Sequence, residues 1–373
     1  MGRLPVELVA HILEELRSEW ITLKNFSLTC SSWRVLSLPF LFRRLSIPNR
    51  GKLIACMALM RSAPYIRPHI RELVLLYGSQ GAAPKGRLFV LDIDYKAFFS
   101  GFPNVATIRC GASPLADILP ILPNMPVTSL HVREWHATAP ELLSFFESCA
   151  TTTRSLTFHT VSFLHPPVNR DMLHVGVVTL PALKDLVFLH CSRRLPLYPK
   201  IDMPSLEVLY CAEWCSKSRE EFPDSLVTLA VDWDLDHPLV SCRPFSVENL
   251  SIVWDFAWSW LSSVMPLVHK LSIPSRLQHL EVLICDNEDW HFHLNDLAAN
   301  DTFEAAILAL HEGGSLRRVT FTLTTERRNA WEEQLTWKDT IGDKFSELKL
   351  LGILEYRFNQ SSVIYPRQPF NHA

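Results

Sequence analysis

From residue 70 onward, one short pattern of apolar positions recurs along the chain. Each copy reads apolar-x-x-apolar-x-apolar, and successive copies begin roughly 20 to 40 residues apart, a spacing typical of repeat proteins. Clear copies begin at Ile70, Val105, Val127, Leu183, Leu206, Leu226, Val247, Leu277, Leu316 and Leu348, and a weaker copy begins at Thr153. Because apolar and polar residues alternate at the end of each copy, the pattern predicts a series of short β-strands.

Helices are predicted between these strands, at residues 92–100, 115–122, 140–149, 258–268, 295–311 and 327–345. This repeated order of strand, loop and helix resembles the degenerate leucine-rich repeat, in which parallel strands pair edge to edge and helices cover the outer side. The asparagine that usually follows the strand is mostly missing, which leaves the register of single units open. We therefore expect an α/β chain whose larger part is an irregular leucine-rich-repeat solenoid, with a non-repeating α/β domain as the alternative.

The first 45 residues follow a helical period instead. An apolar stripe at helical spacing is formed by Leu8, Val9, Ile12, Leu13 and Leu16. Pro5 suits the first turn of this helix, where its missing N–H costs nothing. About 45 residues on short helices are too few to close a core on their own. Part of their apolar surface is therefore expected to face a partner or the following domain.

This all-α segment resembles the F-box over residues 3–46. The matching residues are Leu4-Pro5-x-Glu7-Leu8, Ile12-Leu13 and Leu16, then Leu28-Thr29-Cys30-x-x-Trp33-Arg34, and finally Leu41-Phe42-Arg43-x-Leu45. The resemblance implies that the segment binds the Skp-type adaptor of a cullin–RING ubiquitin ligase. We expect the adaptor contacts at Leu4, Pro5, Leu8, Ile12, Leu13 and Leu28, with Trp33 in the interior. The alternative is a helical cap that packs on the rest of the protein.

These patterns divide the chain into four parts. They are a helical module at 1–46, a linker at 47–69 with a helix near 53–62, a repeat array at 70–360 and a C-terminal tail at 361–373. Pro48 and Pro68 lie near the two ends of the linker, where they favour breaks in regular structure.

Composition narrows the classes of protein that fit. Of the 373 residues, 48% are hydrophobic and 20% are charged, which is typical of a folded protein. The net charge of -3 argues against binding nucleic acid by bulk charge, and 12 glycines argue against glycine-dependent nucleotide folds. We expect neither a signal peptide nor a membrane span, and we place the protein in the cytoplasm or nucleus. The 9 cysteines are scattered singly and are expected to be reduced core residues.

No catalytic, cofactor or metal site is predicted. The segment 81–87 resembles a phosphate loop in spacing, but Arg87 stands where such a loop needs a lysine after its second glycine, and the hydroxyl residue that should follow is missing too. Cys211 and Cys215 have zinc-like spacing without a second pair, and His291 and His293 fit a polar loop better than a metal site. We therefore expect a protein that is not an enzyme.

Several predicted strands end in an acidic residue beside a tryptophan. Because the strands share one pattern, these residues should line one edge of the array, next to wall positions such as His131, Arg133 and Glu281. Residues 200–300 contain 16 Asp and Glu against 6 Lys and Arg, so this surface favours a basic protein segment. The target-binding residues expected are Trp135, Tyr210, Trp214, Asp232, Trp233, Trp254 and Asp255. The alternative is that each tryptophan packs inward.

Together, these expectations describe a substrate-recognition subunit of an SCF-type ubiquitin ligase. The helical module would bind the adaptor and the repeats would hold a protein target, which raises the effective concentration of target lysines near the ligase. The alternative is an interaction scaffold that uses the repeat surface without a ligase.

Overall fold

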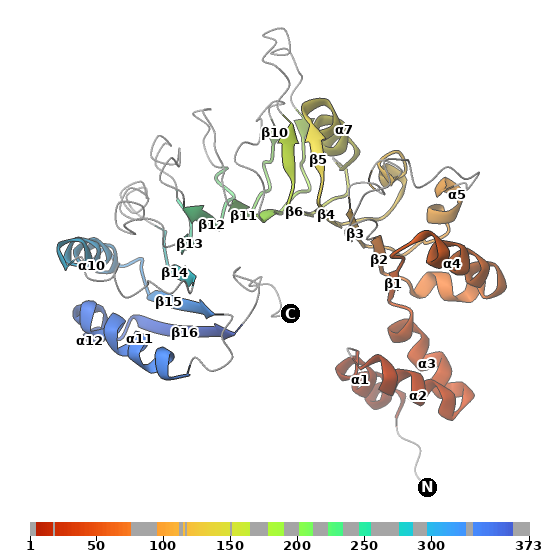
Figure 1. Cartoon of the computed structure of the whole chain (residues 1–373), viewed down its shortest axis with the longest axis horizontal. Coiled ribbons are helices and arrows are strands. Elements are labelled where there is room, and N and C mark those ends of the chain that lie inside the picture. Colours follow the sequence, from red (N-terminus) through yellow and green to blue (C-terminus); the bar gives the residue numbers. More distant parts are fainter. Residues whose placement is uncertain are drawn as a thin grey trace. The chain divides into compact units, whose positions relative to one another are not determined.

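The structure is a computed structural model of the chain, a mixed α/β protein with parallel sheets (Figure 1). It describes residues 5–17, 19–75, 95–111, 115, 118–149, 151–164, 178–189, 201–211, 223–233, 246–254, 276–285, 297–325 and 331–360. The chain divides into two compact units, Met1–Leu183 and Lys184–Ala373.

The first unit begins with three short helices, which we call the helical module: α1 (Val6–Glu15), α2 (Trp20–Thr29) and α3 (Ser31–Leu41). After it, strand β1 (Arg44–Ser46) pairs in parallel with β2 (Glu72–Leu75), so the sheet begins 26 residues ahead of residue 70, where the repeat pattern starts. Helix α4 (Arg50–Ser62) and the short helix η1 (Pro64–His69) lie between these two strands. The expected helix near 53–62 is therefore confirmed as part of α4.

Five parallel strands form the main sheet of the first unit, in the order β1, β2, β3 (Thr107–Gly111), β4 (Ser129–Arg133) and β6 (Ser155–His159). A small second sheet pairs β5 (His136–Thr138) with β7 (Ser162–Leu164). The other described elements of this unit are α5 (Tyr95–Ser100), η2 (Leu122–Asn124), α7 (Ala139–Cys149) and β8 (Val178–Thr179).

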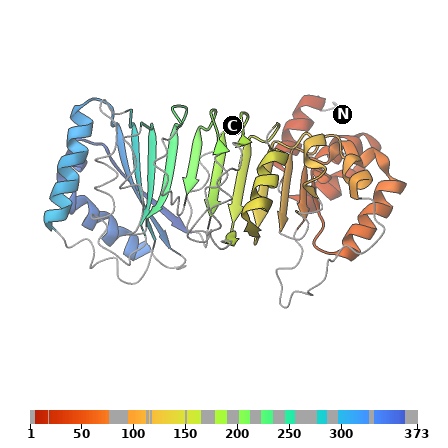
Figure 2. The ribbon, with the colours of Figure 1, turned by 90° about the horizontal axis from the view of Figure 1, so that it is seen from above.

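The second unit continues the same plan with seven parallel strands that neighbour one another in chain order (Figure 2). They are β9 (Asp185–Leu189), β11 (Val208–Cys211), β12 (Thr228–Trp233), β13 (Asn249–Trp254), β14 (His279–Cys285), β15 (Arg318–Thr325) and β16 (Leu354–Gln360). Short strand β10 (Ile201–Asp202) and helices α10 (Leu297–Glu312), α11 (Trp331–Lys344) and α12 (Ser346–Leu350) complete the described elements of this unit.

The recurring pattern predicted ten of these strands and failed at its last copy. The first ten copies in chain order lead into β2, β3, β4, β6, β9, β11, β12, β13, β14 and β15. The copy at Leu348 instead lies in helix α12, and the strand comes after it, at 354–360. Leu348 is fully buried, as the pattern requires, but Leu351 is 51% exposed. A short apolar run fits a buried helix turn as well as a strand, which explains the error.

The core of each unit lies between the sheet and its helices. The apolar positions of the pattern stack across neighbouring strands, as where Leu130 stands in register with Ile108 and Leu156. In the first unit, the Phe145 ring of α7 lies 5.5 Å from the Phe158 ring of β6. In the second unit, Phe303 of α10 lies 6.5 Å from Phe321 of β15 and Trp337 of α11 lies 6.0 Å from Tyr356 of β16. The helices therefore cover the apolar side of each sheet.

Candidate functional site

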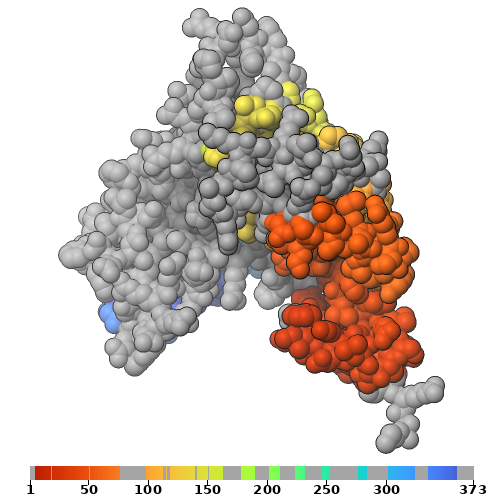
Figure 3. Space-filling model, turned by 45° about the vertical axis from the view of Figure 1, so that its right-hand side comes forward, coloured from red at the N-terminus to blue at the C-terminus, as the bar shows by residue number. Residues whose placement is uncertain are grey.

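The helical module carries apolar side chains on its outside as well as in its core. Along α1, Val9 and Leu13 turn inward, while Leu8 and Ile12 are 51% and 43% exposed. Residues four apart share a face of a helix, so each pair forms its own stripe. Thirteen large hydrophobic side chains are exposed among the described residues, and seven belong to this module: Val6, Leu8, Ile12, Trp20, Ile21, Leu28 and Val35. We call these seven side chains the apolar surface of the module. Figure 3 shows the module itself as the red part of the chain.

The module has little to stabilise it internally. Its core consists of Val9, Leu13 and Leu23, with five further apolar side chains only partly buried against them. The first residues of its three helices receive no side-chain capping hydrogen bond, whereas Asn49 caps α4 by accepting a bond from the Lys52 amide at 3.0 Å. Uncapped helix ends leave backbone groups without protein partners. A small core beside a large exposed apolar surface is typical of a segment that docks on a partner.

Most of the predicted adaptor contacts lie on the outside of the module. Pro5 is exposed at the start of α1, and Leu8, Ile12 and Leu28 belong to the apolar surface. Leu4 lies outside the described residues.

Leu13 is the exception and must be reassigned to the core. It is 0% exposed and packs with Val9 and Leu23, because it lies one turn beyond Val9 on the inward face of α1. Trp33 is half-buried and its ring stacks on Phe26 with the centroids 3.8 Å apart, close to the interior position expected for it.

Sequence reasoning missed four members of the apolar surface, namely Val6, Trp20, Ile21 and Val35. In the sequence, Trp20 comes after the first helix and interrupts its apolar stripe. In the structure it opens α2, with the Lys24 ammonium 5.6 Å from the centroid of its ring. Trp20 and Ile21 directly follow the acidic Glu19, and this pairing is the sequence signal that could have identified Trp20 as an exposed residue.

The sheet of the first unit has a second side, opposite to its helices, that we call the open face. Its positions alternate with the buried ones along each strand. One row across β3, β4 and β6 consists of Arg109, His131 and Thr157 in register. Arg133 lies two positions beyond His131 on the same face of β4 and is exposed. His131 and Arg133 therefore lie on the open face, and their place in a target-binding wall stays a prediction.

The described polar contacts at the centre of the open face involve Glu72 and His131. The Glu72 carboxylate accepts a hydrogen bond from Arg109 Nε at 2.7 Å. Ser129 Oγ lies 3.2 Å from His131 Nε2. Thr157 is 7% exposed, and its Oγ1 has no hydrogen-bond partner. Burial, followed by the charges of Arg109 and Arg133, lowers the pKa of His131 to about 4.

On the corresponding face of the second unit, several described polar side chains bond to one another. His279 Nε2 lies 2.8 Å from Thr320 Oγ1. The Glu281 carboxylate accepts hydrogen bonds from Ser251 at 3.1 Å and from Thr322 at 2.8 Å. Burial and the arginines of β15 and β16 lower the pKa of His279 to about 4. Both carboxylate oxygens of Glu281 therefore accept hydrogen bonds from its neighbours, and its place in a target-binding wall stays a prediction.

Two of the predicted target-binding residues prove to be buried. Trp135 is 7% exposed and its ring lies 5.4 Å from that of Phe145. Glu134 has a φ of 52°, so the chain turns at the end of β4 and carries the next residue inward. Tyr210 is 5% exposed on β11. Neither residue belongs to an exposed aromatic ridge.

The structure does not describe the remaining members of the expected ridge. Trp233 and Trp254 are register partners on β12 and β13, but their side chains, like that of Asp232, lie outside the described part. Trp214 and Asp255 lie outside it altogether, as do residues 81–87, Cys215, His291 and His293.

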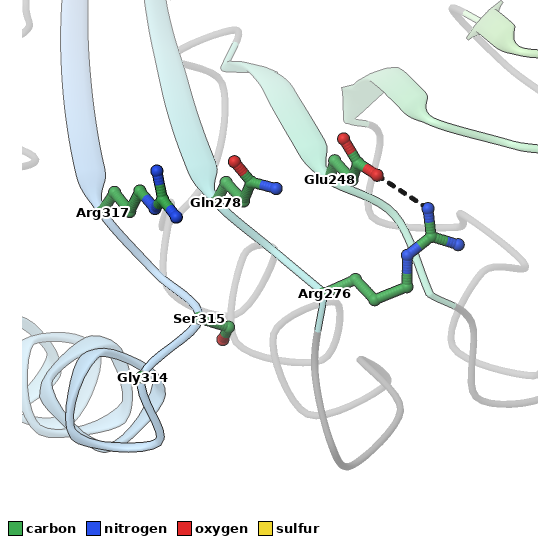
Figure 4. A pocket seen from close by; sticks show the side chains of 6 residues that line it. All are labelled: Glu248, Arg276, Gln278, Gly314, Ser315 and Arg317. Carbon is green, nitrogen blue, oxygen red and sulfur yellow. Dashed lines mark hydrogen bonds and ion pairs between the residues drawn. The ribbon is translucent and has the colours of Figure 1, made fainter.

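A shallow pocket of about 220 Å³ lies where β13, β14 and β15 begin (Figure 4). Arg276 donates to the Glu248 carboxylate at 2.8 Å across it. Gln278, Arg317, Ser315 and Gly314 complete the lining. The lining offers no nucleophile beside a base, so it can bind a polar group but provides no arrangement for covalent catalysis.

A metal site requires clustered ligands, and a reactive thiol requires a pKa low enough for the thiol to ionise. No group of three or more His, Cys, Asp or Glu residues there could hold a metal ion. Burial raises the pKa of the Cys56 thiol to about 11 and those of Cys110 and Cys149 to about 12, so these thiols stay protonated. Among the helices of that part, none is long and apolar enough to cross a membrane.

No family model matches this chain, and no curated protein matches it either.

Proposed function

We propose that this protein is a substrate receptor of a cullin–RING ubiquitin ligase. The helical module docks on a Skp-type adaptor, and the strand-rich remainder of the chain holds the protein to be modified. The observation that carries the proposal is the concentration of exposed apolar side chains on the module, seven of thirteen among the described residues.

The docking part of the proposal follows from burial energetics. Fully burying one aliphatic or aromatic side chain contributes about 1.5–3 kcal/mol. Leu8 and Ile12 lie one turn apart on α1, and Leu28 on α2 is 64% exposed. An adaptor that covered these side chains would stabilise both the complex and a module that has a core of three residues.

The target-holding part rests on the repeated strand pattern. We interpret the successive parallel strands as an irregular leucine-rich-repeat array, because each of the first ten pattern copies leads into a strand, and within each unit these strands follow one another in chain order. Stacked open positions then form a continuous wall with about 4.8 Å between strands. Such a wall is suited to binding a protein segment, and the protein itself performs no bond chemistry.

Co-purification from a co-expression system tests this proposal. The full chain is expressed with a Skp-type adaptor and a cullin, and both should be recovered with it. Leu8→Asp with Ile12→Asp should abolish recovery, since two charges would lie in a desolvated contact. Ile54→Asp on α4, where Ile54 is 50% exposed, is the matched control and should retain both proteins.

Recovery of neither protein with the wild-type chain would contradict the proposal and favour the scaffold that uses its strands without a ligase. Recovery of the adaptor without the cullin would favour that scaffold as well.

A further inference from the structure

Positive charge gathers on the open face of the first unit's sheet. The face carries Arg44 on β1, Arg109 on β3 and Arg133 on β4. Glu72 is its one carboxylate among the described residues. Three guanidinium groups against one carboxylate leave an excess of positive charge at neutral pH.

The single acid does not neutralise this charge. Glu72 Oε1 lies 2.7 Å from Arg109 Nε and 3.8 Å from Arg44 Nε, so two arginines share one carboxylate. Bonding through Nε holds the Arg109 side chain in place and leaves its two terminal nitrogens for another acceptor. Arg133 is exposed and has no ion pair with an acid in the part of the chain that the structure describes.

Neutral hydrogen-bonding groups lie beside these charges. His131 stands between Arg109 and Thr157 in the same row, and its depressed pKa reflects burial and the positive field of Arg109 and Arg133. It is neutral at pH 7. Thr157 Oγ1, more than nine-tenths buried, has no partner of its own. Because this hydroxyl is covered by its neighbours, the exposed arginines are the groups that a ligand on this row would meet.

We propose that this open face binds an acidic segment of the target protein, with Asp or Glu carboxylates pairing with Arg133 and Arg109. The inference rests on the proposed function, because it names the class of target that the receptor holds. The acid-rich segment 200–300 led us to expect a basic target, whereas this face favours an acidic one. Most of the acidic residues of that segment lie outside the described residues.

The composition of the face favours a peptide over a nucleic acid. Single-stranded nucleic acids are bound through basic grooves in which aromatic rings stack on the bases. The described open positions of β1, β2, β3, β4 and β6 contain no Phe, Tyr or Trp. Most of them are Ser, Thr, His or Arg, which match the carboxylates and backbone groups of a peptide.

Fluorescence anisotropy with the full chain tests the inference. The probe is a fluorescein-labelled deca-glutamate peptide, with deca-lysine and oligothymidine of equal length as comparisons. Deca-glutamate should bind at about 50 mM salt and weaken as salt rises, because screening shortens the reach of the arginines. Arg133→Gln should weaken it about fivefold or more, whereas Thr157→Val should leave it within about twofold of wild type because that hydroxyl is covered. Arg61→Gln removes one exposed charge from α4 and should leave binding within about twofold of wild type.

Three outcomes overturn the inference: no measurable binding of deca-glutamate, equal losses in Arg133→Gln and Arg61→Gln, or tighter binding of deca-lysine or oligothymidine. Adaptor capture is measured on the same preparations. A chain that captures the adaptor but not deca-glutamate contradicts the acidic-target inference alone, whereas one that binds deca-glutamate but no adaptor contradicts the proposed ligase role.

Discussion

Within the first unit, the helical module and the parallel sheet place their apolar side chains in opposite ways. In the sheet, Ile108, Leu130 and Leu156 are at most 1% exposed and stand in register across three strands. In the module, Leu8 and Leu28 are more than half exposed. The sheet can therefore stabilise itself, whereas the module retains apolar area for a second protein. That difference indicates that the two regions serve different contacts.

The largest expected effect comes from the core of the sheet. Phe158→Ala removes a fully buried ring that lies against Phe145 and Phe146, so the free energy of unfolding should fall by about 3–5 kcal/mol. Urea unfolding followed by circular dichroism measures it. Leu28→Ala in the module is the contrasting variant and should change stability by less than about 0.5 kcal/mol, because the side chain is 64% exposed. Equal losses of unfolding free energy in Phe158→Ala and Leu28→Ala would contradict the difference in burial between the sheet and the module.

The core of the module should respond locally. Leu13→Ala empties a site among Val9 and Leu23 and should cost the module about 2–4 kcal/mol. Amide hydrogen exchange should then accelerate in α1, α2 and α3 while β3, β4 and β6 keep their protection. If exchange accelerates in the strands by the same factor, the module and the sheet form one cooperative core.

Acid should weaken the sheet through its half-buried histidine. The pKa of His131 is about 4 in the folded chain against an ordinary value of 6.5, so the unfolded chain binds more protons between these values. The histidine's contribution to stability is complete above pH 6.5 and is lost as pH falls toward 4. Urea unfolding at about pH 7.5 and about pH 4.5 should show wild type losing about 1–2 kcal/mol more than His131→Gln. The same loss in both proteins would contradict the assignment.

A smaller effect is expected from the capped helix of the second unit. Glu304 is 9% exposed and accepts hydrogen bonds from the amides of Glu347 at 2.9 Å and Leu348 at 3.1 Å, which satisfies the first turn of α12. Glu304→Gln should lower stability by about 1 kcal/mol because one charged acceptor is lost. The control Glu312→Gln changes an exposed residue of α10 and should have no measurable effect in the same urea titration. If Glu304→Gln lowers the free energy of unfolding no more than Glu312→Gln does, the two hydrogen bonds of Glu304 contribute little to stability.

The sequence predicted the strands well because the apolar positions of each pattern copy are the positions that its strand buries. Leu229 and Val231 are both fully buried two positions apart, as strand alternation requires. The pattern carries no information on the path of the chain after a strand ends. Trp135 turns inward because Glu134 adopts a positive φ, and this backbone feature has no signature in the residue types.

The module shows a different limit of sequence reasoning. The apolar residues of α1 extend from its buried side to its exposed side. The sequence alone therefore could not show that Leu13 is buried and that Ile12 is exposed. Only packing against α2 decides which residues belong to the core. The basic open face was missed for a related reason. Arg109 and Arg133 lie 24 positions apart in sequence and become neighbours through the pairing of β3 with β4.

Docking of the adaptor on the helical module is tested most directly by hydrogen exchange with and without a purified Skp-type adaptor, because exchange maps where a partner covers the chain. Exchange should slow in α1 and α2, where Leu8, Ile12 and Leu28 are exposed, and should stay unchanged in strands β11 to β15. The Leu8→Asp, Ile12→Asp double variant should show no such protection. Protection confined to the strands, or exchange that the adaptor leaves unchanged throughout the chain, would contradict docking on the module.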